Sequence, residues 1–150
     1  MEATLGHTFT SFVDHLVYTA QHQTLLIVFD ASGSQHLQPT RTNCPHRSSP
    51  KYLHSSKLVD VVNISDLSVL MVMVTKIAMD GYIQVGKEIK RIAIWGLMST
   101  QADNPRLSLT LSRLSKTNES CKVIIGDNKD KVDGVHVNRK LSKWCVIDTN

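Results

Sequence analysis

The stretch from Lys57 to Ser99 constrains the fold of this chain more than any other part. It reads KLVDVVNISDLSVLMVMVTKIAMDGYIQVGKEIKRIAIWGLMS. The pattern predicts a strand at 58–64, a Ser-containing corner, a helix at 66–79 that ends at a glycine, and a second apolar strand at 89–98. No residue in this stretch belongs to a recognisable catalytic motif. It therefore indicates a scaffold that packs or assembles, which points away from an enzyme.

The predicted helix at 66–79 is apolar on nearly every side. One face carries Leu67, Leu70, Val74, Ile77 and Ala78, and the other side carries Val69, Val72 and Met73. A helix of this kind is either enclosed in a core or in contact with another subunit. For the second group of side chains, burial in the core is the simpler hypothesis and self-association is the alternative.

The remaining segments complete the predicted fold. A short amphipathic helix is expected between Phe9 and Ala20, and a buried strand at 24–30. A loop rich in Ser, Pro and His follows at 34–56. Half-exposed or short strands are expected at 105–114, 121–125, 135–138 and 143–148. The sum is an α+β fold, with an antiparallel sheet packed against one central helix. Residues 1–56 form a partly irregular N-terminal segment with this basic loop, and residues 57–150 form the compact domain.

The charge distribution favours an anionic partner. The net charge is +4 and the isoelectric point is near 9.1. The expected contacts with a membrane or a nucleocapsid are Arg41, Arg47, Lys51 and Lys57, which have no acid among them, and a second cluster of Lys87, Lys90 and Arg91. A third cluster contains Arg139, Lys140 and Lys143. Ordinary solvated surface is the alternative interpretation, and it suits the two smaller clusters better than the first.

Length and hydropathy fit one soluble domain of 150 residues. The longest apolar run, 69–74, is far too short to cross a bilayer, and the N-terminus lacks the order of a signal peptide. We therefore expect an intracellular protein.

No catalytic or metal-binding motif is present. Phosphate-binding loops, nucleophile elbows and paired CxxC sequences are all missing. The three cysteines are far apart, and Cys44-Pro45-His46 lacks the second ligand pair that a zinc site needs. Asp127, Asp130 and Asp133 superficially match a calcium loop, but lysines interrupt them, so we expect a solvated turn. The sequence thus predicts no catalytic residue, no metal and no cofactor.

The order of these segments resembles the rhabdovirus matrix proteins, small basic proteins that line the inside of the virion. In that family a strand leads through a Ser-containing corner into a hydrophobic helix, a glycine-marked basic loop and an apolar strand. The matching parts here are 59–64, Ser65-Asp66, 67–79, 81–87 and 92–97. Near the C-terminus, Val135-His136-Val137, Arg139 and Trp144-Cys145-Val146-Ile147 look like the final strand of lyssavirus-type members. The short chain would suit a plant-infecting member. The string Ser49-Pro50-Lys51-Tyr52 lacks the second proline of the late motif in animal-virus members.

This resemblance implies a non-catalytic structural protein. Such a protein self-associates, condenses the viral nucleocapsid and bridges it to the anionic inner face of the envelope, with the glycoprotein tail as a further partner. It would be found in the virion and in the host cytoplasm or nucleus, and no sequence-specific nucleic-acid binding is expected. Two alternatives stay open. One is a plant-virus movement protein of the 30K type that binds nucleic acid, although its Leu-x-Asp signature is missing. The other is a small intracellular adaptor domain.

Overall fold

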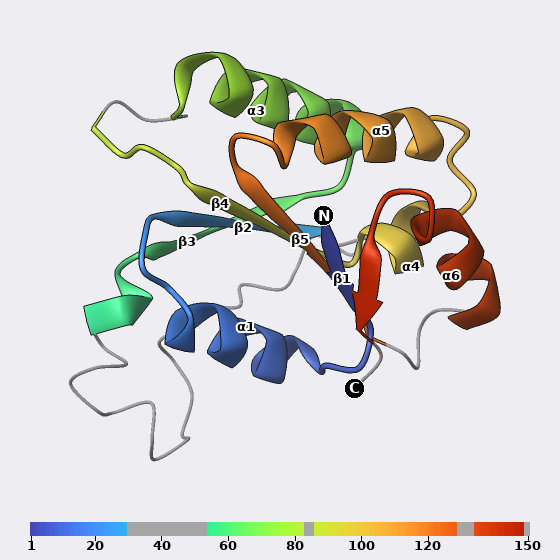
Figure 1. The fold of residues 1–150 in the computed structure, drawn as a ribbon, viewed down its shortest axis with the longest axis horizontal. Coiled ribbons are helices and arrows are strands. Elements are labelled where there is room, and N and C mark those ends of the chain that lie inside the picture. The colour runs from blue at the N-terminus through green and yellow to red at the C-terminus, as the bar shows by residue number, and fades with distance from the viewer. Residues whose placement is uncertain (30–53, 83–85, 129–133, 149–150) are drawn as a thin grey trace.

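The computed structural model describes residues 1–29, 54–82, 86–128 and 134–148 (Figure 1). Strands and helices alternate along most of this chain. The strands are β1 (Glu2–Thr4), β2 (Thr24–Phe29), β3 (Val59–Ile64), β4 (Arg91–Trp95), β5 (Lys122–Gly126) and β6 (Val146–Asp148). The helices are α1 (Phe9–Tyr18), α3 (Leu67–Asp80), α4 (Leu97–Gln101), α5 (Leu107–Thr117) and α6 (Gly134–Leu141), and a single helical turn lies at 54–56.

The six strands form one sheet in the order β3-β2-β4-β5-β1-β6, and every pair in it is parallel. The expected antiparallel sheet with one central helix is therefore wrong, and the fold is α/β. The physical reason lies in the connections. Adjacent parallel strands need a crossover across a face of the sheet, usually a helix, whereas antiparallel strands can be joined by a tight turn.

Helices cover both faces of the sheet (Figure 1). On one face, α1 packs through Phe12, Val13, Leu16 and Val17 against β2, β4 and β5. On the other face lie α3 and α5, together with the buried residues of α4 and α6. Because β2 lies between β3 and β4 and is covered on both faces, all six of its residues are buried. This double burial explains why its sequence, TLLIVF, lacks the alternation of a half-exposed strand.

The segment expected as a half-exposed strand at 105–114 is instead mostly helix α5. Its buried leucines are Leu107, Leu111 and Leu114, whereas Leu109 is exposed. Spacings of four and three residues are helical, but leucines at 107, 109 and 111 also fit the two-residue period of a strand. Short apolar patterns of this kind are ambiguous, and here the helical period is the one that buries side chains.

Two further expectations near the C-terminus also change. The predicted strand at 135–138 lies in helix α6. The solvated turn expected around Asp127, Asp130 and Asp133 changes at its first residue, since Asp127 is buried, and the other two residues lie outside the described ranges. By contrast, the helix at 66–79 and the strands at 58–64 and 24–30 are confirmed, with bounds that differ by at most one residue.

The N-terminal segment contributes two strands to the same sheet as the rest of the chain. β1 lies between β5 and β6, and β2 lies between β3 and β4. Its predicted basic loop at 34–56 lies almost entirely outside the described residues.

Candidate functional site

Helices α3 and α5 lie side by side on the outer surface and run in the same direction (Figure 1). Helix α3 begins after Asp66, whose side chain accepts the backbone N–H of Ser68 over 2.8 Å, and it ends at Gly81 in the left-handed conformation. Both helices bury one side against the sheet. Their outward sides meet in a groove, which we call the α3–α5 groove.

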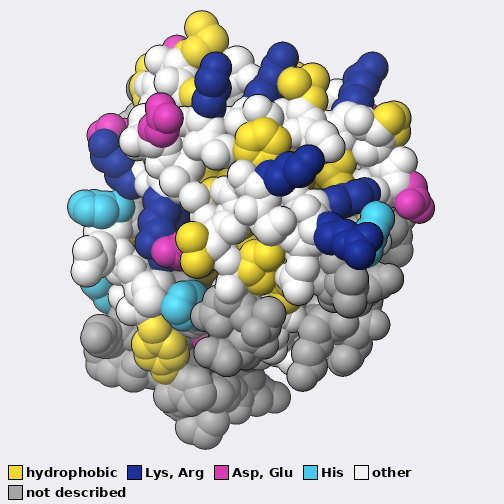
Figure 2. Space-filling model, turned by 45° about the vertical axis from the view of Figure 1, so that its right-hand side comes forward, with side chains coloured by type: hydrophobic (Ala, Val, Ile, Leu, Met, Phe, Trp, Pro, Cys, Tyr) yellow, Lys and Arg dark blue, Asp and Glu magenta, His cyan; other side chains and the backbone are white. Residues whose placement is uncertain are grey.

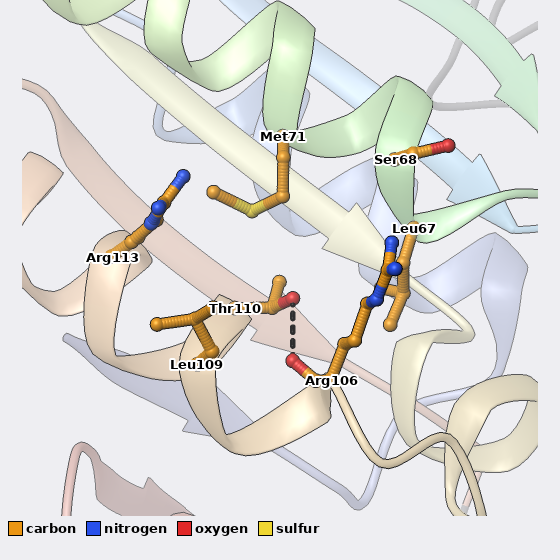
Figure 3. Close-up of a pocket in the computed structure, with 7 residues that line it drawn as sticks. All are labelled: Leu67, Ser68, Met71, Arg106, Leu109, Thr110 and Arg113. Carbon is orange, nitrogen blue, oxygen red and sulfur yellow. Dashed lines mark hydrogen bonds between the residues drawn. The ribbon is translucent and has the colours of Figure 1, made fainter.

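The first hollow of the α3–α5 groove lies where both helices begin (Figure 3). Its volume is about 250 Å³, and its lining residues are Leu67, Ser68, Met71, Arg106, Leu109, Thr110 and Arg113. Thr110 donates its hydroxyl to the carbonyl of Arg106 over 2.9 Å, so it is turned back onto its own helix. The rest of the lining is mainly apolar, with an arginine at either end of the α5 side.

A second hollow continues the groove toward the ends of the helices. It has a volume of about 390 Å³, and it is lined by Met71, Val72, Thr75, Lys76, Met79, Asp80 and Arg113. Met71 and Arg113 line both hollows, so the two adjoin. Three apolar side chains of the groove are exposed by more than half: Val72 at 69%, Met79 at 79% and Leu109 at 57%. Large apolar side chains gathered in this way often mark a contact with another molecule.

The charges around the groove are arranged asymmetrically. Arg106 lies at the first hollow, and Asp80 and Lys76 lie at the second. Asp66 lies close enough to Arg106 for the arginine to help lower the pKa of its carboxyl, after the larger effect of the hydrogen bonds from Ser68. One end of the groove therefore presents an arginine, and the opposite end presents an acid beside a lysine.

The three predicted contact residues of α3 lie in different places. Val72 lines the α3–α5 groove. Val69 is 45% exposed and is not part of either hollow. Met73 is half-buried against the core and lines a separate hollow beside β3, with Val62 and Ile89. Met73 is thus partly buried in the core, whereas Val69 and Val72 are surface residues.

The predicted cationic contacts are also separated. Arg41, Arg47 and Lys51 lie outside the described residues, and Lys57 is exposed just before β3. Lys87 forms an ion pair with Asp60 at 3.4 Å, and Lys90 forms one with Glu88 at 2.7 Å. Arg91 begins β4 and is half-buried. Among the described cations of this set, Lys90 and Arg91 line a common pocket at the start of the strands.

The side of the molecule that carries α4 and α6 shows the same mixing of charge and apolar surface (Figure 2). Lysine and arginine side chains are spread over it, with hydrophobic side chains between them rather than in one separate patch.

Two features of the described residues that bear on chemistry are the cysteine thiols and the placement of metal-ligating side chains. Burial raises the pKa of the Cys121 and Cys145 thiols to about 11, so both are protonated, weak nucleophiles at neutral pH. Within the described ranges, no group of three or more His, Cys, Asp or Glu side chains is positioned to hold a metal ion. No helix among these residues has the length and hydropathy to cross a bilayer.

The sequence pointed to Val72 but missed the other half of the groove. Leu109, Arg106 and Arg113 were assigned to a strand or its edge, where Leu109 would share a face with the buried leucines. Arg106 and Arg113 are seven residues apart, which is about two turns of a helix and places both on one side of it. This spacing was the sequence signal that could have indicated a helix here. Comparison with models of protein families and with the curated proteins found no match to this chain.

Proposed function

We propose that this protein is a non-catalytic structural protein that assembles with copies of itself through the α3–α5 groove. The observation that carries the proposal is the cluster of Val72, Met79 and Leu109, which are all more than half exposed along two adjoining hollows. Burying large apolar side chains against a partner stabilises an interface by about 25 cal/mol per Å² of apolar surface removed from water. An isolated exposed valine would need no such explanation.

The charge pattern favours a second copy of the chain as the partner. Most closed assemblies use two-fold contacts, in which the same surface meets itself. A two-fold axis through the middle of the groove would lay two copies of α3 antiparallel. The Arg106 end of one groove would then lie over the Asp80 end of the other. Each copy therefore supplies one member of each of two equivalent opposite-charge pairs, with Met71 and Arg113 of both copies between them.

A viral matrix layer is the specific form of this function that the sequence resemblance suggests. Self-association is the property that the groove supports. Condensation of a nucleocapsid and attachment to the inner face of an envelope rest on the resemblance and on the basic loop at 34–56. The parallel sheet differs from the fold expected for that family, so the proposal takes no support from the architecture.

The decisive experiment compares two substitutions in the same helix. Val72→Asp places a carboxylate in the groove, whereas Val69→Asp makes the same change at an exposed position outside it. We expect concentration-dependent association of the unchanged protein in sedimentation equilibrium, loss of association in V72D, and association retained in V69D. Circular dichroism checks that both variants fold. A protein that stays monomeric up to its solubility limit, or equal loss in both variants, would contradict the proposal.

A second measurement tests the matrix role separately. The protein is floated with neutral and with anionic liposomes at low and high salt, at concentrations where it associates. A matrix layer predicts binding to the anionic liposomes that weakens as salt rises. Association without any liposome binding would retain the structural function and reject the membrane role. A monomer that ignores liposomes and coats single-stranded RNA would instead favour the movement protein.

A further inference from the structure

A cationic pocket lies at the amino ends of the strands, on the side covered by α1. Its volume is about 500 Å³. The charged and titratable side chains that line it are Glu2 of β1, His15 of α1, His22, Lys90, Arg91 of β4 and Lys122 of β5. Because parallel strands all begin at the same edge of the sheet, residues about 30 to 120 positions apart in the chain converge here. We call it the amino-end pocket.

Arg91 is fixed in this pocket by three hydrogen bonds. Its Nε donates to Thr24 Oγ1 over 2.9 Å, its Nη1 donates to Thr19 Oγ1 over 2.7 Å, and its Nη2 donates to the carbonyl of Leu16 over 2.6 Å. The guanidinium therefore holds the end of α1 against the start of β2. A guanidinium has five N–H groups, so one on each Nη remains available for another acceptor.

Arg91 is a half-buried cation whose partners are all neutral. Among the residues that the structure describes, no carboxylate forms an ion pair with it. Its surroundings lower the pKa of the guanidinium through burial, which disfavours the charged form. Charges that are removed from water are normally paired. The pocket thus contains a half-buried positive charge that no described carboxylate compensates, and a bound anion would supply that compensation.

The neighbouring charges make the pocket positive as a whole. Lys90 and Lys122 line it with Arg91, and Glu2 is the one carboxylate among its lining residues. Glu2 lies 3.7 Å from Lys122, in a pair that is more than half exposed, and Lys90 is paired with Glu88 outside the pocket. Exposed pairs of this kind contribute little and exchange readily for a better acceptor. Both lysines can therefore turn toward an anion beside Arg91.

We propose that the amino-end pocket binds a phosphate monoester, with Arg91 as the fixed donor and Lys90 and Lys122 as adaptable donors. A monoester carries between one and two negative charges at neutral pH and several acceptor oxygens. The lining cations and Glu2 leave an excess of two positive charges to balance it. The pocket volume exceeds that of a bare phosphate, so it has room for a small organic group. This site is separate from the α3–α5 groove and does not depend on self-association.

The test is a titration of the full chain by isothermal calorimetry at low ionic strength, with inorganic phosphate and then with glycerol 3-phosphate. We expect saturable binding of both at one site. Lys90→Gln and Lys122→Gln should each weaken binding about fivefold, which is the loss of one partly exposed charge contact. Arg91 is left unchanged because its hydrogen bonds hold α1. Lys116→Gln removes an exposed lysine of α5 and serves as the matched control.

Three results would overturn the proposal: no saturable binding, equal weakening in K116Q, or binding that the double variant K90Q/K122Q leaves unchanged. Binding of single-stranded RNA without binding of inorganic phosphate or glycerol 3-phosphate would also overturn it. A further arm distinguishes the two sources of a monoester. Binding to vesicles of phosphatidic acid in phosphatidylcholine that is lost in the double variant and displaced by glycerol 3-phosphate assigns the site to a lipid headgroup. Saturation by the soluble monoester without vesicle binding assigns it to a small metabolite.

Discussion

The carboxylate of Asp127 accepts a hydrogen bond from the backbone N–H of Ser99 over 2.8 Å, which ties the end of β5 to the first turn of α4. The N-cap of α4 is Gly96, which has no side chain to accept the free N–H groups of that turn. A side-chain oxygen normally comes from the N-cap itself. Here it comes from a neighbouring strand, and Asp127 is only 1% exposed as a result.

Removal of this acceptor should destabilise the protein. Asp127→Ala leaves the N–H groups of Ser99 and Asn128 without their acceptor, and a lost cap or an unsatisfied buried donor costs about 2 kcal/mol. Asp127→Asn retains one carbonyl oxygen and should cost less. Urea unfolding followed by circular dichroism gives the free energy of unfolding of each variant. Equal stability of D127A and the unchanged protein would show that the cap is not energetically significant.

The pH dependence of the free energy of unfolding should also show a contribution from Asp127. Burial raises the pKa of its carboxyl above the ordinary value of 3.8, an effect that the hydrogen bonds from Ser99, Asn128 and Met98 only partly oppose. Because the folded state then binds the proton more tightly than the unfolded state, this group makes the protein more stable as pH falls toward 3.8. Relative to D127N, the unchanged protein should therefore gain free energy of unfolding between neutral pH and pH 4. A constant difference between the two over this range would contradict the argument.

His15 should act in the opposite direction. Its pKa is lowered from 6.5, first by burial and then by the charges of His7, Arg91 and Lys122, while Glu2 opposes the shift. The unfolded state therefore takes up a proton at a higher pH than the folded state. Stability is retained above pH 6.5 and is lost as pH falls below it. We expect His15→Gln to lose less free energy of unfolding than the unchanged protein between pH 7 and pH 5. Guanidinium unfolding across this range measures the difference.

Two glycines allow backbone strain to be separated from close packing. Gly96 and Gly86 both have a left-handed backbone, with φ of +84° and +91°. A Cβ at Gly96 would lie 2.9 Å from the carbonyl oxygen of Phe29, whereas a Cβ at Gly86 would have no atom within 4 Å. Gly86→Ala should cost about 1 kcal/mol from strain alone. Gly96→Ala should cost at least about 1 kcal/mol more, because β2 and β4 must move apart. Equal melting temperatures for the two variants would argue against this close approach.

The sequence predicted well those elements whose apolar pattern fits only one kind of secondary structure. The run TLLIVF has no alternation, and it forms a strand that is buried on both faces. The leucines of RLSLTLSRL fit both a strand and a helix, and the incorrect choice removed the crossover between β4 and β5. Together with the strand predicted at 135–138, which is part of helix α6, this assignment made a parallel sheet look antiparallel. The continuous apolar strand at 24–29 was the available sign of a parallel sheet.

The sites were less predictable than the fold because they depend on contacts between distant parts of the chain. Asp127 was expected in a solvated turn, yet it is buried against α4, 28 residues earlier. Lys90 and Arg91 were recognised as a basic cluster, but Lys122 joins them only through the parallel register of β4 and β5, in which Arg91 is opposite Lys122. Neither the contact of Asp127 with α4 nor that of Lys122 with Lys90 and Arg91 can be predicted from the sequence alone. A glycine at the start of a helix, as at Gly96, does indicate that an acceptor must come from elsewhere.

The geometry proposed for self-association makes a sharper prediction than the loss of an apolar contact. Asp80→Arg should place an arginine opposite Arg106 of the second copy, and Arg106→Asp should place an acid opposite Asp80. Each variant alone changes two equivalent contacts of a two-fold dimer, so we expect the dissociation constant to rise about tenfold or more. The double variant D80R/R106D restores opposite charges at both positions. It should therefore associate nearly as well as the unchanged protein, whose net charge it shares.

Sedimentation equilibrium at two salt concentrations measures these constants, and the losses should shrink at high salt because exposed charges are screened. Asp103→Arg, at an exposed position outside both hollows, serves as the control for a general effect of charge. A double variant that dissociates as readily as each single variant would reject the antiparallel two-fold arrangement. In that case V72D would still report whether the groove is an interface. D80R raises the net charge by two and R106D lowers it by two, so weakening in both single variants together with restoration in the double variant cannot come from general surface charge and requires pairing of the two positions.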